Sequence, residues 1–172
     1  DFDKDVKDVN AGMDQIDESL DKACCKEKHI TEGNHDNWLN YAVEKYPYIP
    51  QYRFATAVRL NDRGYKYHQF GKHLKMGKLY FYHGHQYGGQ YHTSNHLRKL
   101  GCNIMYGHWH DIQQMSATHM DGPKSAWSIG CLKDMKAESN AWLANRRINW
   151  AHAFAIVDFY ARGLFTVHII QI

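Results

Sequence analysis

The sequence lacks several features that would place the chain in a special class of protein. No apolar run approaches the roughly 18 residues that cross a membrane. The acidic start, Asp1–Asp5, lacks the apolar core of a signal peptide. The four cysteines, Cys24, Cys25, Cys102 and Cys131, have neither zinc-site spacing nor the density of a disulfide framework. These absences predict no membrane partner, reduced thiols and a cytoplasmic location.

Strong charge is also missing. The formal net charge is +3, and lysine and arginine are scattered rather than gathered into a basic stripe. Nucleic acid is therefore compatible with the sequence as a partner but is not indicated by it. A length of 172 residues, 44% of them hydrophobic and 23% charged, predicts one globular domain over residues 1–172. Histidine is abundant, with 13 copies.

Hydrophobic periodicity predicts alternating helices and strands. Helices are expected over 5–27, 38–46 and 92–100, with an ambiguous alanine-rich stretch over 135–147. Strands are expected over 29–31, 78–82, 102–106, 113–119, 125–129, 154–160 and 164–172. The last two strands form a hairpin if Gly163 takes the left-handed conformation in a three-residue turn. Residues 51–76 give a weak pattern that suggests an aromatic hairpin or irregular strands.

Three histidine-bearing motifs each follow a predicted strand. They are Gly33-Asn34-His35-Asp36, His83-Gly84-His85 and Gly107-His108-Trp109-His110. Loops at strand ends are where a rigid sheet presents chemistry. A helix and a strand separate the second motif from the third, which suits a β-α-β crossover that returns both loops to one sheet edge. The eight remaining histidines belong to no motif and are expected at the surface or in an ordinary hydrogen-bonded core.

The residue types suit metal-dependent chemistry. In an extended segment, residues two apart point the same way, so His108 and His110 can reach one metal site. The alternative is a chance pair in a histidine-rich chain. The Asn34 amide oxygen is a neutral, hard ligand, and His35 beside it would face a metal-held phosphate. Asp36 either fixes the His35 ring or merely caps the following helix.

The order and wording of these motifs resemble the calcineurin-like metallophosphoesterase superfamily. Its signature runs D-x-H, G-D-x-x-D, G-N-H-[DE], a lone H-G and G-H-x-H, and the chain carries the last three blocks. Phe2-Asp3-Lys4-Asp5 before a long helix, and the segment 149–154, look like the phage-type members. Residues 128–132 resemble the family's small-residue segment after G-H-x-H. The resemblance covers most of the chain, from about Phe2 to the last strand.

The resemblance implies both a fold and an activity. The fold would be α/β, a β-sandwich flanked by helices in four layers (α/β/β/α), here short of its first strand or two. The activity would be hydrolysis of a phosphomonoester or phosphodiester by a metal-activated hydroxide, in the host cytoplasm if the chain is phage-encoded. Two divalent ions (Mn, Fe, Zn or Ni) would be held by Asn34, His83 and His108 on one side and His110 on the other. His35, steered by Asp36, would assist the leaving group, and His85 and Trp109 would face the substrate or support the ligands.

Two departures from the family leave alternatives open. Trp109 replaces a small residue, and the D-x-H and G-D-x-x-D blocks that supply carboxylates are absent, as if the chain began just after them. Neutral ligands alone hold two dications poorly, so we expect this chain by itself to be weak or inert. A missing strand would leave an open edge that could pair with another copy. The alternatives are a nuclease of the same superfamily or a non-catalytic metal-binding or partner-binding remnant. The nuclease would want a basic or aromatic groove, for which the candidates are dispersed: Tyr65, Lys66, Tyr67, Arg98 and Lys99.

Overall fold

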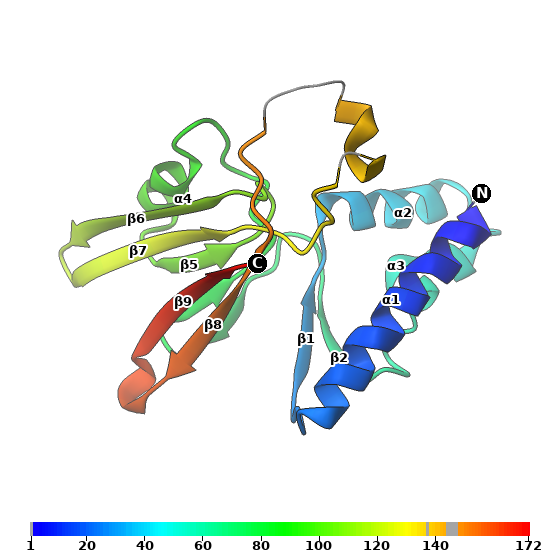
Figure 1. The fold of residues 1–172 in the computed structure, drawn as a ribbon, viewed down its shortest axis with the longest axis horizontal. Coiled ribbons are helices and arrows are strands. Elements are labelled where there is room, and N and C mark those ends of the chain that lie inside the picture. The colour runs from blue at the N-terminus through cyan, green and yellow to red at the C-terminus, as the bar shows by residue number, and fades with distance from the viewer. Residues whose placement is uncertain (1, 137, 144–147) are drawn as a thin grey trace. The chain divides into compact units, whose positions relative to one another are not determined.

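The protein is a mixed α/β chain whose computed structural model describes residues 2–136, 138–143 and 148–172 (Figure 1). Helices and several sheets are present, which confirms the α/β class. The chain divides into two compact units, Asp1–Lys72 and His73–Ile172. Each unit is described by itself, and the expectation of one domain over 1–172 stays a prediction.

The first unit pairs two strands and surrounds them with helices. Its elements are α1 (Phe2–Lys22), β1 (Lys28–Thr31), α2 (Asn34–Lys45), η1 (Pro50–Tyr52), α3 (Phe54–Ala57) and β2 (Tyr65–His68). β1 and β2 are parallel, with Ile30 opposite Tyr67. The core of the unit is formed by Phe54, Val58 and Leu60. The predicted strand at 29–31 is therefore confirmed, and its partner is the strand at 65–68.

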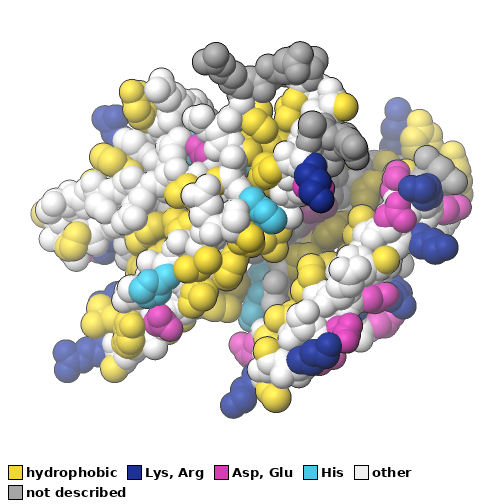
Figure 2. Space-filling view, viewed as in Figure 1, with side chains coloured by type: hydrophobic (Ala, Val, Ile, Leu, Met, Phe, Trp, Pro, Cys, Tyr) yellow, Lys and Arg dark blue, Asp and Glu magenta, His cyan; other side chains and the backbone are white. Residues whose placement is uncertain are grey.

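Helix α1 is held largely by polar contacts. Charged side chains run along the face that Figure 2 shows, and none of the helix's residues is fully buried. Arg63, whose side chain is only 6% exposed, binds Asp14 at 2.7 Å and Asp17 at 2.6 Å. Its guanidinium also donates to Asn10 Oδ1 at 3.0 Å. One planar group with several donors thus fastens two turns of α1 to the turn between α3 and β2.

The second unit is built on a five-stranded sheet. Its elements are β3 (Leu74–Met76), β4 (Leu79–Phe81), α4 (His92–Leu100), β5 (Asn103–Tyr106), β6 (Ile112–His119), β7 (Gly122–Ile129), η2 (Glu138–Leu143), β8 (Ala153–Phe159), η3 (Ala161–Gly163) and β9 (Phe165–Gln171). The strand order is β3-β4-β5-β7-β6, in which β4, β5 and β7 run parallel. The β4-α4-β5 connection is the predicted β-α-β crossover.

The two faces of this sheet are covered differently, which gives the unit three layers. Ile104 and Tyr106 of β5 join Leu97 of α4 in one buried cluster. Met105, which alternates with them, joins Leu79 and Trp127 on the other face, packed against residues of β8 and β9. Figure 1 shows α4 and the β8–β9 hairpin on opposite faces of the sheet. Because side chains alternate along a strand, β5 serves both layers at once.

Four predicted elements differ from the observed ones. The helix expected over 5–27 is α1, which begins at Phe2 and ends at Lys22. Helix α2 begins at Asn34 rather than Trp38, because Asp36 closes its first turn on the amide of Gly33. Of the two alternatives for 51–76, the aromatic hairpin is wrong, since β2 pairs with β1 while β3 pairs with β4, and the stretch contains two short separate strands. The ambiguous stretch 135–147 contains the short helix η2, and residues 137 and 144–147 lie outside the described residues. The hairpin turn at 161–163 is confirmed, with Gly163 at φ +72°.

Two expectations about the chain as a whole can be compared with the structure. Within the described ranges, no helix combines the length and the apolar character that crossing a bilayer requires. All four cysteines, each of which lies in a described range, are free thiols.

Candidate functional site

Two of the three histidine motifs lie at one edge of the sheet. His83 follows β4 and His108 follows β5, and these neighbouring strands are parallel. The backbone amide of His108 donates to the carbonyl of His83 at 3.1 Å, which joins the two loops directly. Gly84, at φ +97°, leaves no room for a side chain, since a Cβ would come within 2.6 Å of the Tyr106 ring. A residue with a side chain would force this loop away from the sheet.

The histidine rings of these two loops gather in one place. His83 Nε2 lies 2.8 Å from His108 Nδ1, and the ring centroids are 4.7 Å apart. The His85 ring is 6.0 Å from that of His83 and 6.3 Å from that of His108. Burial lowers the pKa of His85, which favours its neutral form. Neutral imidazoles are the form that binds a metal ion.

Trp109 braces the loop that carries these rings. Its indole Nε1 donates to the carbonyl of Gly84 at 3.2 Å. Its ring stacks on His92 of α4, with centroids 5.2 Å apart and planes 18° apart. A Cβ on Gly88 would meet the same indole at 2.9 Å. Trp109 therefore packs among backbone and rings of the unit, and its predicted role toward a substrate stays a prediction.

His110 sits in a turn and not in an extended segment. Its amide donates to the carbonyl of Gly107 at 3.1 Å, and its φ is +62°, in the left-handed region. The expectation of an extended G-H-W-H segment is therefore wrong. The turn places the His110 ring against Trp150, with centroids 4.8 Å apart. Convergence of His110 with His108 on a common point stays a prediction.

A buried polar network lies next to these loops. Asp111, directly after His110, is 7% exposed, and its Oδ2 lies 3.0 Å from His92 Nε2. Its Oδ1 accepts from Ser128 Oγ at 2.7 Å. The other ring nitrogen of His92, Nδ1, lies 2.7 Å from the Tyr106 hydroxyl. Burial raises the pKa of Tyr106, so this hydroxyl keeps its proton and can donate it to Nδ1. His92 would then direct its Nε2–H at the Asp111 carboxylate.

A second buried pair has the same form. The Tyr82 hydroxyl bonds His96 Nδ1, and His96 is fully buried one helical turn after His92. Burial lowers the pKa of His96 to about 4, with the nearby His92 acting in the same direction. The His96 ring stacks on Tyr106 with centroids 4.0 Å apart. Both histidines therefore tie α4 to the strands whose ends carry the histidine motifs.

The third motif lies in the first unit, in the first turn of α2. Asn34 and His35 are the first two residues of the helix, and the amide of Gly33 donates to Asp36 Oδ2 at 2.9 Å. Burial raises the pKa of Asp36, an effect partly offset by the Gly33 hydrogen bond. The exposed His35 ring packs on Trp38, with centroids 4.4 Å apart. Asp36 thus acts as a helix cap in this structure, and its steering of His35 stays a prediction.

The residue just before this motif is a buried carboxylate. Glu32, 3% exposed, bonds the side-chain amide of Asn40 through Oε1. Its Oε2 accepts from the Tyr67 hydroxyl at 2.5 Å and from the amide of Phe70 at 2.8 Å. Glu32 lies between the end of β1 and the start of α2, and its hydrogen bonds reach α2, β2 and the segment after β2. Its carboxylate therefore holds these elements together through hydrogen bonds to both oxygens.

Sequence reasoning missed Glu32, His92, His96 and Asp111 as residues of the site's surroundings. The signals that could have found them are local. Asp111 directly follows the G-H-W-H motif, Glu32 directly precedes G-N-H-D, and His92 and His96 are four residues apart on one helix face. None of these spacings reveals that the four side chains are buried.

The fit to a metal ion is partial. The His83 and His108 nitrogens, 2.8 Å apart, are hydrogen-bonded to each other. Two nitrogens that each lie about 2.0–2.1 Å from a tetrahedral zinc ion are about 3.3–3.4 Å apart, so the two rings would have to separate and release the proton between them to share an ion. Within the described residues, no three or more histidine, cysteine, aspartate or glutamate side chains are arranged to hold a metal ion. The second unit thus offers a pair of converging imidazoles, and Asn34 lies in the other unit.

The comparisons with known proteins add no relative. No protein-family model matches the sequence, and neither a curated protein nor a solved structure matches the chain.

Proposed function

We propose that this chain is a metal-dependent phosphoesterase domain with a metallophosphoesterase-like fold, acting on a phosphomonoester or phosphodiester in the cytoplasm. The observation that carries the proposal is the convergence of His83 and His108 from the ends of two neighbouring parallel strands. Each motif contributes one ring nitrogen, and the two nitrogens are in hydrogen-bond contact, from which they would separate to about 3.3–3.4 Å on a shared ion. The order of the three histidine motifs supports the same activity.

In this proposal each residue has a distinct role. His83, His108, His110 and Asn34 would hold two divalent ions, which when bound supply a hydroxide nucleophile near neutral pH. Trp109 keeps the His108 loop against Gly84 through its indole hydrogen bond. His35, exposed at the start of α2, would donate a proton to the leaving oxygen of the ester. The amides of the first turn of α2 favour an anion beside it.

One observation favours a second candidate, a non-catalytic binding domain of the same fold. The described residues contain no group of three side chains arranged for a metal, and each oxygen of Asp111 is engaged by other side chains. Such a domain would bind a metal weakly through two imidazoles and would not turn substrate over. The two candidates therefore differ in a measurable way.

The test is a titration of the purified chain with Mn²⁺, followed by electron paramagnetic resonance of the free ion. We expect His108→Gln to weaken Mn²⁺ binding by at least about tenfold, because a ligand is lost. His168→Gln, at an exposed histidine of β9, is the matched control and should leave binding unchanged. Equal Mn²⁺ binding by the wild type and His108→Gln would refute the proposed ligand.

Turnover of bis-p-nitrophenyl phosphate tests catalysis, in an enzyme completed with the carboxylate blocks that this chain lacks. There His35→Ala should lower the rate by roughly 10²- to 10⁴-fold, as is typical for loss of a general acid, while Mn²⁺ binding stays as in the wild type. If His35→Ala loses Mn²⁺ as severely as His108→Gln, the assigned roles are wrong. Weak Mn²⁺ binding without turnover by the wild type would favour the binding domain.

A further inference from the structure

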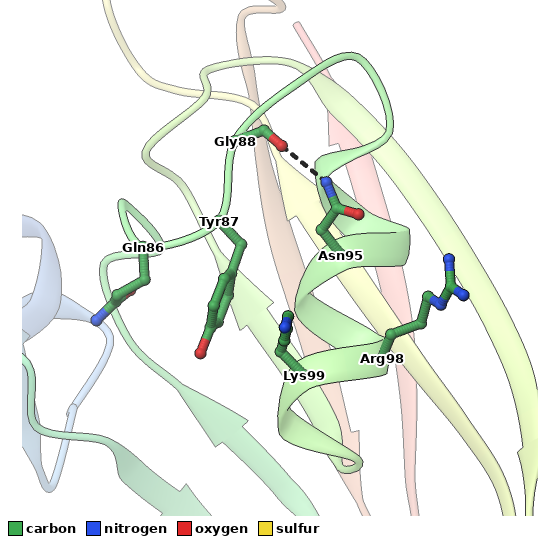
Figure 3. A pocket seen from close by; sticks show the side chains of 6 residues that line it. All are labelled: Gln86, Tyr87, Gly88, Asn95, Arg98 and Lys99. Carbon is green, nitrogen blue, oxygen red and sulfur yellow. Dashed lines mark hydrogen bonds between the residues drawn. The ribbon is translucent and has the colours of Figure 1, made fainter.

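A polar pocket of about 540 Å³ opens directly after the His83–His85 loop, in the second unit. It is lined by Gln86, Tyr87, Gly88, Asn95, Arg98 and Lys99. Figure 3 shows the loop residues on one side of the pocket and the α4 residues on the other. Its volume lies within the range of about 300–1,000 Å³ that is usual for small-ligand sites.

The loop side of the pocket presents a firmly seated aromatic ring. Tyr87 is half-buried, and its ring meets the buried His96 ring edge to face, with centroids 5.1 Å apart. His96 is itself held by the Tyr82 hydroxyl. The Tyr87 ring, two residues after His85, is therefore positioned by its contact with the buried His96 ring. A planar group could stack on Tyr87 there.

The helix side of the pocket is cationic. Arg98 and Lys99 are exposed in the last turn of α4, and no acidic side chain lines the pocket. Cations at a helix C-terminus are also favoured by the helix dipole alone. That explanation accounts for the two charges but not for the aromatic ring and the amides that complete the pocket. In Figure 3, Lys99 lies toward Tyr87, while Arg98 extends away from it.

Two carboxamides complete the lining. The Asn95 side chain donates from Nδ2 to the carbonyl of Gly88 at 2.8 Å, which ties α4 to the loop and fixes the orientation of this amide. Gln86 is exposed on the other side of the loop. A carboxamide offers a donor and an acceptor together, and this pattern matches the edge of a nucleobase.

We propose that this pocket binds a nucleotide unit, with the base stacked on Tyr87 and the phosphates held by Arg98 and Lys99. The combination of an aromatic platform, two cations and two amides is the chemistry that recognises single-stranded nucleic acid or a free nucleotide. A phosphorylated amino acid would use the cations but not the amide edge. The inference rests on the proposed function, because it names the substrate class of the adjacent histidine site. It places Lys99 beside an aromatic ring, with Arg98 next to it in the lining of the same pocket.

The test is fluorescence anisotropy of a labelled ten-residue oligothymidylate, with unlabelled dTMP, thymidine and inorganic phosphate as competitors. All measurements are made in EDTA, so that a failure of metal-dependent hydrolysis does not affect them. We expect dTMP to compete better than thymidine or phosphate alone. Competition by phosphate alone as effective as that by dTMP would overturn the proposal, because the base would then contribute nothing.

Matched variants assign the binding to the pocket. Tyr87→Leu should raise the dissociation constant roughly 5- to 150-fold, whereas Tyr87→Phe, which keeps the ring, should bind as the wild type. Arg98→Gln and Lys99→Gln should each weaken binding on the order of tenfold. Their controls are Arg162→Gln and Lys78→Gln, at exposed cations on other elements of the same unit. Unchanged binding by Tyr87→Leu, or equal losses in the controls, would refute the site.

Two further results identify the source of the nucleotide. Binding of the oligonucleotide at least tenfold more tightly than dTMP, with strong salt dependence, would mean that Arg98 and Lys99 hold successive phosphates of a strand. Equal affinities would mean that the pocket takes a free nucleotide. Binding of neither probe at millimolar concentration would overturn the proposal, whatever the outcome of the metal titration.

Discussion

The buried His96 should make the stability of the second unit depend on pH between about 4 and 6.5. Burial holds the pKa of His96 near 4 in the folded chain, against an ordinary value of 6.5. Above pH 6.5 the ring is neutral in both states, and its full contribution to stability is present. As the pH falls toward 4, the unfolded chain takes up a proton that the folded chain does not, so stability is lost.

The size of this loss follows from the pKa difference. At about 1.4 kcal/mol per pH unit, the loss reaches about 2 kcal/mol at pH 5 and approaches about 3 kcal/mol below pH 4. This loss is a large fraction of the stability of an ordinary domain, which is about 5–15 kcal/mol.

The measurement is urea unfolding at pH 7.5 and pH 5, followed by tryptophan fluorescence. Four of the five tryptophans, Trp109, Trp127, Trp142 and Trp150, lie in the second unit and report mainly on it. His96→Asn keeps an acceptor near the position of Nδ1 for the Tyr82 hydroxyl but cannot titrate. Its loss of the ring that stacks on Tyr106 should cost roughly 1–3 kcal/mol at pH 7.5.

The informative quantity is the difference in free energy of unfolding between the wild type and His96→Asn, compared at the two pH values. Groups that titrate alike in both proteins do not contribute to the change in this difference, which is called the gap below. We expect the gap between the wild type and His96→Asn to narrow by about 2 kcal/mol at pH 5. His168→Asn, at an exposed histidine, should show no such narrowing. A constant gap for His96→Asn would refute the argument that a neutral His96 is required by the fold.

Two other changes test contacts inside each unit, Arg63 in the first and Gly84 in the second. Arg63→Lys should lower the free energy of unfolding by about 1–3 kcal/mol in urea titrations, because an ammonium cannot serve Asp14, Asp17 and Asn10 together. Arg59→Lys, at a more exposed cation that contacts the same face of α1, should change the free energy of unfolding by less than about 1 kcal/mol. Gly84→Ala should destabilise the chain more than Gly122→Ala, since both have a positive φ but only Gly84 has the Tyr106 ring within 2.6 Å of the added Cβ. Equal losses at Gly84 and Gly122 would mean that backbone strain, not the Tyr106 ring, sets the cost.

Local signals in the sequence predicted much of the second unit. Helix α4 ends at Gly101 in the left-handed conformation, as the glycine after a cationic last turn indicates. The β8–β9 hairpin follows from alternating apolar residues around Gly163. The crossover between His83 and His108 follows from a helix placed between two short apolar strands. Each of these features is decided by residues close together in the chain, so a linear pattern suffices.

The features that were missed depend on pairing between distant residues. Tyr65 and Tyr67 alternate as a strand should, but their partner is β1, more than thirty residues earlier. The predicted start of α2 is too late because Gly33 has no side chain that could mark a helix cap. The capping hydrogen bond is instead donated by the Gly33 amide to the Asp36 carboxylate. The turn at His110 was missed because nothing in the motif requires a non-glycine residue to adopt a positive φ.

The buried histidines show why the candidate site could be only half predicted. The sequence singled out the histidines that follow strands, and two of them, His83 and His108, do converge. It gave His92 and His96 no role, yet they connect α4 to Tyr106 and Tyr82, at the ends of the two strands that lead into His108 and His83. An imidazole can accept from a tyrosine hydroxyl on one nitrogen and donate from the other, and His92 has such partners on both sides, the Tyr106 hydroxyl and the Asp111 carboxylate. These two tyrosine–histidine pairs restrain the loops that carry His83 and His108. Moving the end of either strand would leave a buried hydroxyl or imidazole without its partner, at a cost of about 1–3 kcal/mol for each group.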